Sequence, residues 1–172
     1  MPARGSILGV VVELACDVVR NRPSRLILDA ATRAFAALPG ATGSLAPGSP
    51  ELVLTPEGEP SYWLVTGHGP GGVEAIARVL LDGHVATVGP SPAGAEDASA
   101  AVTGLSRPRA ALARPPGAIN GPILVHDGPI AREAWLHITV DQDGNRRWVF
   151  TTAGGSYHRP AGEPLGGGGP LP

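Results

Sequence analysis

The chain contains no lysine, one cysteine and one methionine among its 172 residues. Its 13 cationic side chains are therefore all arginines. Together with the many alanines, glycines and prolines, this indicates a GC-rich, bacterial coding sequence. A single cysteine excludes an intramolecular disulfide framework and fits a reducing compartment, so we expect a cytoplasmic protein. The arginines form no basic run, which excludes the electrostatic footprint of a nucleic-acid-binding protein.

Charged residues are also scarce, at 16% of the chain, whereas an average globular protein has about 25%. Glycine and proline number 25 and 19, so we expect a compact core that carries long irregular loops. A chain of this length suits one domain and can bury a core without disulfides or metal. The apolar run over residues 6–15 is interrupted by Glu13 and followed by Asp17. We therefore expect neither a signal peptide nor a membrane span.

Two helices are predicted near the N-terminus, over residues 6–20 and 24–38, because their apolar residues recur with helical spacing. In the second of these helices the apolar stripe begins at Ile27. It ends at Leu38, directly before a Pro-Gly pair that cannot continue a helix.

After residue 50 the pattern changes to strict alternation. The segments 51–55 and 61–66 are predicted to be strands of one hairpin, because a five-residue turn rich in Pro, Glu and Gly lies between them. A helix over 71–82 is predicted next, and a short strand over 84–88 follows it.

The second half of the chain begins with residues 89–120, which are rich in Ala, Pro, Gly and Ser. We predict a mobile loop there, with one helical turn near 96–102. Three further strands are predicted at 122–126, 131–140 and 146–152. The Gly- and Pro-rich tail, 154–172, is predicted to be disordered. The sequence thus predicts a single α+β domain over 1–153, in which two N-terminal helices and one crossover helix flank an antiparallel sheet.

The segment Gly67–Gly72 fits the pattern G-x-G-x-x-G. It follows a predicted strand and opens a predicted helix, which is the setting in which backbone amides bind phosphate. However, no acid follows the next strand to bind a ribose, Pro70 removes one amide, and no further strand–helix alternation extends a parallel sheet. We therefore favour a structural turn, or a cleft for another ligand, and we keep a nucleotide-binding enzyme as an alternative.

No catalytic or metal site is predicted elsewhere. The five histidines show no ligand spacing, and they are His68, His84, His126, His137 and His158. The run from Asp141 to Asn145 resembles the start of a calcium loop, but Arg146 stands where such a loop needs glycine. Cys16 is interpreted as a small core residue. Nucleophile, zinc and paired-carboxylate motifs are absent from the sequence.

Two segments resemble a GAF domain. The first, VVELACDVVRNRPSRLILDAATRAFAALPGATGSLA (11–46), resembles the paired N-terminal helices that lead into the first strand. The second, GHGPGGVEAIARVLLDGHVATVGP (67–90), is similar to the glycine turn, helix and strand of that family. A looser likeness covers 120–141, with PILVHDG as its hairpin. PAS-like and profilin-like folds share this arrangement of helices on an antiparallel sheet and remain alternatives.

The resemblance implies a cavity between sheet and loops that binds a small molecule, or a role as a dimerisation module. By position, the cavity would be walled by the predicted elements between residues 61 and 88 and by the loop after them. The ligand-binding residues that the resemblance implies are Trp63, His68, Gly69, Gly72 and His84.

Three functions follow as hypotheses. The first is a non-catalytic sensory or regulatory domain that binds a small molecule or a partner protein. The second is a pure protein–protein interaction module of the adaptor or immunity type. The third is a nucleotide-dependent enzyme that uses Gly67–Gly72. We also expect a homodimer that has no nucleic-acid partner and no membrane association. The sequence does not identify a cofactor.

Overall fold

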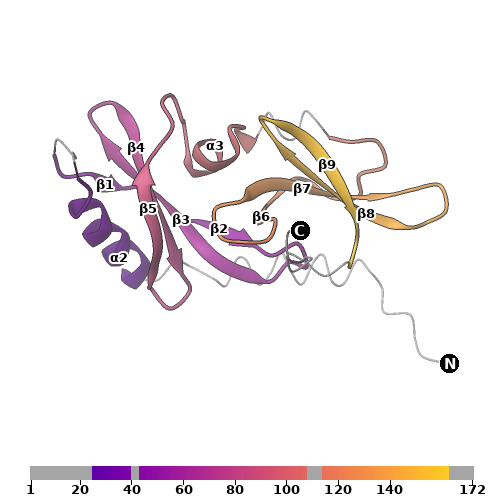
Figure 1. The fold of residues 1–172 in the computed structure, drawn as a ribbon, viewed down its shortest axis with the longest axis horizontal. Coiled ribbons are helices and arrows are strands. Elements are labelled where there is room, and N and C mark those ends of the chain that lie inside the picture. The colour runs from indigo at the N-terminus through magenta and orange to yellow at the C-terminus, as the bar shows by residue number, and fades with distance from the viewer. Residues whose placement is uncertain (1–24, 40–42, 108–113, 163–172) are drawn as a thin grey trace, which may run out of the picture.

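The computed structural model of the chain describes residues 25–39, 43–107 and 114–162. This part of the chain folds as α+β, with one mixed, mostly antiparallel sheet of nine strands and two helices (Figure 1). Neither helix is long and apolar enough to cross a membrane. The helix predicted over 6–20 lies outside the described residues.

Two antiparallel meanders of four strands each make up the sheet. The first consists of β2 (Glu51–Leu54), β3 (Pro60–Gly69), β4 (Gly72–Leu80) and β5 (Val85–Pro90). The second consists of β6 (Ile123–His126), β7 (Glu133–Val140), β8 (Arg146–Thr152) and β9 (Gly155–Pro160). The strand order is β5-β4-β3-β2-β6-β7-β8-β9, and the short β1 (Ala46–Pro47) also pairs with β3. The meanders meet where β2 and β6 run parallel, at the pair Leu54 and Val125.

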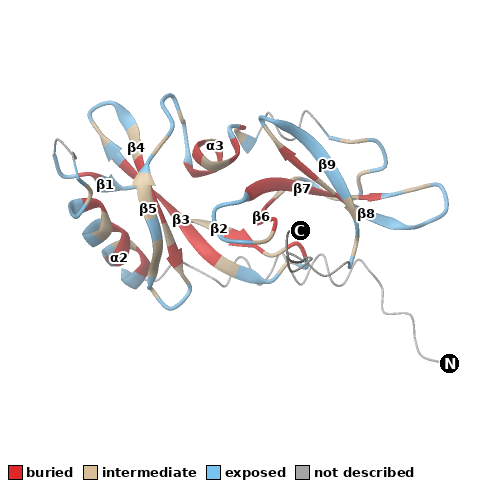
Figure 2. Cartoon of the chain, viewed as in Figure 1, coloured by how far each residue is buried: buried red, intermediate tan, exposed pale blue. Residues whose placement is uncertain are grey.

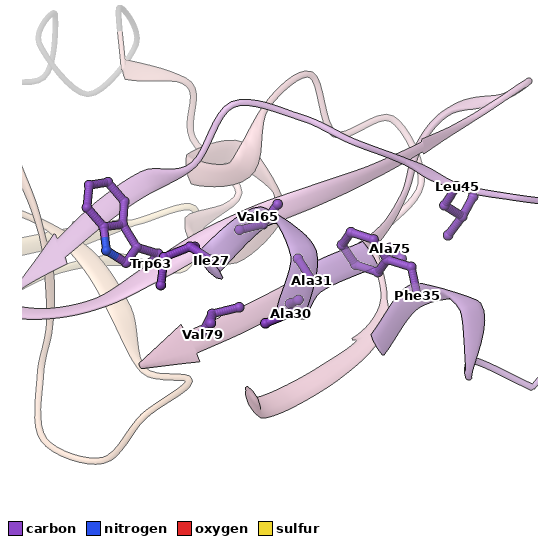
Figure 3. Close-up of a cluster of buried hydrophobic side chains, with 10 residues drawn as sticks. Ile27, Ala30, Ala31, Phe35, Leu45, Trp63, Val65, Ala75 and Val79 are labelled. Atoms are coloured by element: carbon purple, nitrogen blue, oxygen red, sulfur yellow. The ribbon is translucent and has the colours of Figure 1, made fainter. Parts of the chain in front are cut away.

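The helix α2 (Arg25–Ala36) confirms the prediction of a helix over 24–38. Its buried residues follow helical spacing and pack on β3, β4 and β5. Figure 3 shows Ile27 and Phe35 of this helix in one cluster with Trp63 of β3 and Val79 of β4. Burial of a side chain such as Ile27 or Phe35 contributes about 1.5–3 kcal/mol, so this cluster fixes α2 on the sheet. We call the sheet face under α2 the α2 face.

The helix predicted over 71–82 is wrong, because these residues form β4. This strand lies between β3 and β5, and it is buried on both faces. Ala75, Ala77 and Val79 pack under α2, whereas Ile76 belongs to a second cluster on the opposite face. A strand that is buried on both faces reads as a nearly continuous apolar run, which periodicity cannot distinguish from a buried helix. The expected crossover helix is therefore a central strand.

The short helix α3 (Ala98–Thr103) confirms the helical turn predicted near 96–102. The Asp97 side chain accepts a hydrogen bond from the Ala100 amide, and Gly104 ends the helix in the left-handed conformation. This helix covers the other side of the sheet, which we call the α3 face (Figure 1). Its cluster contains residues from both meanders, namely Val53, Tyr62, Leu64, Ile76, Leu124 and Trp135.

The long loop predicted over 89–120 is shorter and more ordered in its described parts. β5 extends to Pro90, and α3 occupies the middle of the segment. Near its end, Ala118 forms a bridge with Thr139, and the Ile119 amide donates to the Ile138 carbonyl. This end therefore lies along β7 and adds to the sheet.

The structure also differs from the prediction of a disordered tail from residue 154. Gly155–Pro160 form β9, which pairs with β8 along its whole length. The chain reverses at Gly155, whose φ of +127° strongly favours glycine. Tyr157 then stacks on Phe150 of β8, with ring centroids 5.1 Å apart. The composition of this segment does not predict the strand, because the strand is held by the contacts of two side chains, Tyr157 and Arg159. Residues 163–172 lie outside the described residues.

The remaining strand predictions are confirmed. β2 and β3 form the predicted first hairpin, β6 matches 122–126, and β7 and β8 form the predicted long hairpin. Figure 2 shows that burial is concentrated in the central strands, whereas β9 is exposed along most of its length. The outer strands of the sheet, β5 and β9, are thus its solvent-exposed edges.

Candidate functional site

The residues that the GAF resemblance implied as a ligand site do not come together. Trp63 is buried in the core under α2, and His68 is exposed near the other end of β3 with its ring bonded to Thr66. Gly69 and Gly72 pair at the β3–β4 turn. His84 is exposed beyond the opposite end of β4. Since β4 has nine residues at about 3.3 Å each, roughly 30 Å separates the two ends.

The glycine motif at residues 67–72 is a β-hairpin turn. Gly69 lies opposite Gly72, and Gly72 has a φ of +101°. The Gly71 amide donates to the Glu74 carboxylate at 2.9 Å, so the chain's own acid occupies an amide that a phosphate would need. The motif is followed by a strand in place of the predicted helix. The setting required for dinucleotide binding is absent at this motif.

The segment 141–145, which resembles the start of a calcium loop, is also a hairpin turn, between β7 and β8. The Asp141 carboxylate accepts hydrogen bonds from the amides of Asp143 and Asn145, at 3.0 and 2.8 Å. These hydrogen bonds lower the pKa of Asp141. Its carboxylate thus organises the turn. Within the described residues, no group of three or more potential metal ligands gathers.

The most concentrated polar chemistry in the described structure lies on the α3 face, around Glu133. We call Tyr62, Arg78 and Glu133 the Glu133 cluster. Arg78 Nε and Nη2 donate to the two carboxylate oxygens, at 2.5 and 3.0 Å, and the Tyr62 hydroxyl donates to Oε1 at 2.8 Å. The Glu133 side chain is only 1% exposed. Such a bidentate, charge-assisted pair is among the strongest hydrogen-bonded arrangements in proteins.

The Glu133 cluster holds its members in fixed protonation states. Burial raises the pKa of Tyr62, and the adjacent charge and hydrogen bond of Glu133 raise it further, so the phenol stays a neutral donor. Burial alone would lower the pKa of Arg78, but the hydrogen bond and the charge of Glu133 outweigh it, and the net shift is upward. An arginine, a carboxylate and a neutral phenol satisfy one another there, and none remains free as a general acid or base.

His126 lies beside the Glu133 cluster. Its ring centroid is 5.6 Å from that of Tyr62. Its Nδ1 is 2.6 Å from the Gly128 carbonyl oxygen, which can only accept, so Nδ1 carries the proton. Its Nε2 atom is buried and has no hydrogen-bond partner in the described part of the chain.

A second polar cluster lies on the α2 face around Asp127, and we call it the Asp127 cluster. The Asp127 side chain is fully buried. The Tyr157 hydroxyl donates to it at 2.6 Å, Arg159 pairs with both of its oxygens at 2.9 and 3.0 Å, and Arg132 is 3.6 Å away. Burial and the Asp127 hydrogen bond raise the pKa of Tyr157 to about 12. The cluster therefore ties β9 to the end of β6.

Unpartnered polar atoms gather at a third place, on the α3 face of β7. His137 has no exposed surface, and both of its ring nitrogens lack a partner among residues 25–39, 43–107 and 114–162. Burial lowers the pKa of His137, and the charge of Arg114 lowers it further. Asn120 accepts from the Ile138 amide at 2.5 Å, and its own Nδ2 is unpartnered in the same part of the chain. His137 is thus held as a neutral core residue.

Sequence reasoning missed Arg78, Glu133 and Asp127. Each of them lies within or at the end of an apolar strand. Arg78 lies between Ala77 and Val79 in β4. Glu133 is the first residue of β7, and Asp127 directly follows β6. A charge inside an apolar strand is a usable signal, because such a residue is almost never buried without a partner. Its partner could not be identified in advance, because the residues that meet are 55 positions apart.

Comparisons with known proteins give no family for this chain. No family model, no curated protein and no solved structure matches it.

Proposed function

We propose that the chain is a non-catalytic regulatory domain that binds a partner protein by strand addition at β9. The observation that carries the proposal is that β9 ends the sheet as an exposed strand, with backbone groups directed outward. An extended segment of a partner can pair with such an edge through main-chain hydrogen bonds. This is the partner-protein form of the sensory or regulatory function that the sequence suggested.

The polar clusters support a binding role over a catalytic one. Among the described residues the buried acids are Glu133 and Asp127, and each accepts hydrogen bonds from an arginine and a tyrosine. The Asp127 Oδ1 atom has no hydrogen-bond partner in this part of the chain but lies 2.9 Å from Arg159 Nη1. The hydrogen bonds of these two acids join strands that are not adjacent in the sheet, so the two clusters have a structural role. A catalytic acid or base needs a proton site within reach of a substrate, whereas both carboxylates are buried against an arginine.

The hydrogen-bond pattern identifies the groups that β9 offers. The Ala161 amide donates to the Arg146 carbonyl, so this pair faces inward. Inward and outward residues alternate along an antiparallel strand, so Ser156, His158 and Pro160 direct their backbones away from β8. Ser156 and His158 each offer an N–H and a carbonyl. Pro160 offers a carbonyl alone, which limits the length of strand that can pair.

Charge favours an acidic partner segment at this edge. Arg132 and Arg159 share the single carboxylate of Asp127, which leaves one positive charge in excess. Arg146 is exposed at the same end of the β8–β9 ladder and makes no ion pair within the described residues. A partner strand that carries Asp or Glu would be steered to this edge.

A photo-crosslinking amino acid at position 158 tests the proposal inside cells that produce the protein. The control carries the same group at Glu57, an exposed position in the β2–β3 turn. We expect a protein that crosslinks from position 158 and not from position 57. A protein captured equally from both positions, or from neither, would contradict strand addition at β9.

The captured partner is then purified and its affinity measured against two matched variants. His158→Pro removes the outward N–H, and His158→Ala removes the side chain but keeps that N–H. Proline is tolerated where the missing donor faces solvent, so both variants should fold. We expect His158→Pro to weaken binding about tenfold or more through the lost hydrogen bond and the ring's bulk, and His158→Ala to bind nearly as the wild type. Equal affinities would overturn the proposal.

A further inference from the structure

The other end of the sheet, β5, differs from β9 in one respect: it carries no charge. Its six residues are Val85, Ala86, Thr87, Val88, Gly89 and Pro90. Proteins usually protect an edge strand with charged side chains, especially lysine, or with proline. On β5 the only such device is the proline at its end. The strand is partly exposed, and within the described residues it pairs with β4 alone.

The direction of the free backbone groups on β5 follows from one hydrogen bond. The Ser91 amide donates to the Glu74 carbonyl at 2.9 Å, so Ser91 faces inward. By alternation, Val88 and Pro90 direct their backbones outward and Gly89 directs its backbone toward β4. Pro90 has no N–H to offer. The outward donor in this half of β5 is therefore the Val88 amide, with its carbonyl beside it.

We propose that β5 is a homodimer interface, at which two copies of the chain pair their β5 strands antiparallel about a twofold axis at Val88. In this register each Val88 amide donates to the Val88 carbonyl of the other copy, and the two sheets become one. A twofold interface is self-complementary, so any charge near the axis faces its own like charge. β5 avoids this because it is neutral, whereas β9 carries Arg159 and His158. The two edges thus suit different partners, a second copy at β5 and an acidic segment at β9.

The helix beside β5 supports the same arrangement. The Leu26 side chain lies against Gly83 in the β4–β5 turn, so the side of α2 that carries Leu26 faces the β5 edge. Asp29 and Arg33 lie on this side by helical spacing, and both are exposed. Neither forms an ion pair within the described residues.

The twofold axis gives these two charges complementary partners. The axis places the two α2 helices antiparallel on the same face of the joined sheets. Each helix packs mainly on its own β4, and three strand spacings separate the two β4 strands, so the helices lie about 14 Å apart. Asp29 of one copy then faces Arg33 of the second copy, and Arg33 faces Asp29. The long Arg33 side chain can reach across most of this gap at the solvent-exposed margin. The pairs add electrostatic specificity to the main-chain hydrogen bonds.

Sedimentation equilibrium of the purified full chain tests the interface. We expect a species of twice the 17.4 kDa monomer mass that dissociates on dilution. Val88→Pro removes the central N–H, whereas Val88→Ala shortens the side chain and keeps the N–H. We expect Val88→Pro to weaken the dimer about thirtyfold or more, because both central hydrogen bonds are lost, and Val88→Ala to remain a dimer. A wild type that stays monomeric at several hundred micromolar, or a Val88→Pro dimer of unchanged affinity, would overturn the proposal.

Charge exchange on α2 provides a test that leaves β5 unaltered. Asp29→Arg and Arg33→Asp each place like charges across the axis, and each should weaken the dimer roughly threefold to tenfold at low salt. The double exchange Asp29→Arg/Arg33→Asp restores both pairs across the axis, so its affinity should return to within about twofold of the wild type. A double variant as weak as the sum of the single variants would show that these residues do not meet.

The two edges are tested separately. His158→Pro should leave the dimer intact, and Val88→Pro should leave partner binding at β9 intact. Loss of the dimer by His158→Pro would assign the self-association to β9 and would contradict the β5 interface while leaving strand addition at β9 open to its own test.

Discussion

His126 and Asp127 are consecutive in the chain, but their side chains lie on opposite faces of the sheet. His126 contacts Tyr62 beside the Glu133 cluster on the α3 face. Asp127 accepts from Tyr157 and Arg159 on the α2 face. The Glu133 cluster and the Asp127 cluster thus meet at the end of β6, on opposite faces of the sheet.

Each cluster bends the sheet in its own direction. Arg78 on β4 and Glu133 on β7 are four strand spacings apart, about 19 Å in a flat sheet, yet their side chains are in contact. The sheet must curve toward the α3 face to bring them together. Asp127, at the end of β6, reaches β9 across the α2 face, so the second meander curves the opposite way. The two buried acids therefore specify the shape of the sheet as well as its stability.

Removal of Glu133 should destabilise the protein strongly. Glu133→Ala leaves the partly buried Arg78 guanidinium without a counter-charge and Tyr62 without an acceptor, so we expect the free energy of unfolding to fall by about 3–5 kcal/mol. The double variant Arg78→Met/Glu133→Leu leaves no buried charge and should lose less than the single variant. Urea unfolding followed by tryptophan fluorescence measures both. A single-variant loss below about 1 kcal/mol would show that the pair is solvated.

Asp127→Ala should release β9 before the rest of the sheet unfolds. Tyr157 and Arg159 lose their shared acceptor, and β9 then depends on its ladder with β8 and on the Phe150 stack. Hydrogen exchange should show faster exchange of the β8 and β9 amides, with the protection of β3 and β4 unchanged. Tyr157→Phe, which keeps the ring and the two arginine contacts, is the matched control and should have a smaller effect. Uniform loss of protection over both meanders would contradict a local role for Asp127.

Most of the strand positions and two of the hairpins could be predicted from the sequence, because alternation and turn chemistry are local. The hairpins of β2 with β3 and of β7 with β8 have polar faces or turn residues that mark their register. The helix α2 was predictable because its exposed face carries Arg25, Asp29 and Arg33.

The missed elements depend on distant contacts. β4 is buried on both faces, so its Ala, Ile and Val residues satisfy helical and strand spacing equally. β9 depends on Asp127, roughly thirty positions earlier in the chain. The residues of the implied site are separated for the same reason: because residues 72–80 are a strand, the glycines and His84 lie at opposite ends of it.

Gly72→Ala tests the hairpin interpretation of the glycine motif. A φ of +101° is strained for any residue with a side chain, so we expect a loss of about 1–3 kcal/mol in the free energy of unfolding. Gly71→Ala is the matched control, since Gly71 lacks a positive φ and its added methyl group would meet only the end of the Glu74 side chain. It should be nearly neutral. If Gly72→Ala were as stable as the wild type, the turn would differ from the one described.

His137 should make the protein less stable in mild acid. Burial lowers its pKa below the 6.5 of a free histidine, and Arg114 adds to this effect. The unfolded chain therefore binds a proton that the folded chain resists, and stability rises with pH in this window. The contribution of a neutral His137 is complete above about pH 6.5 and is lost as the pH falls through the lowered folded-state pKa.

The measurement is the free energy of unfolding between pH 8 and pH 5, compared between two leucine variants. His137→Leu replaces the buried ring with an apolar side chain of similar size and should flatten the acid side of the profile. His84→Leu, at an exposed turn position, should keep the slope of the wild type. If the His137→Leu profile were parallel to that of the wild type, the acid sensitivity would come from other groups, and His137 would have a hydrogen-bond partner that accepts its proton in the folded state.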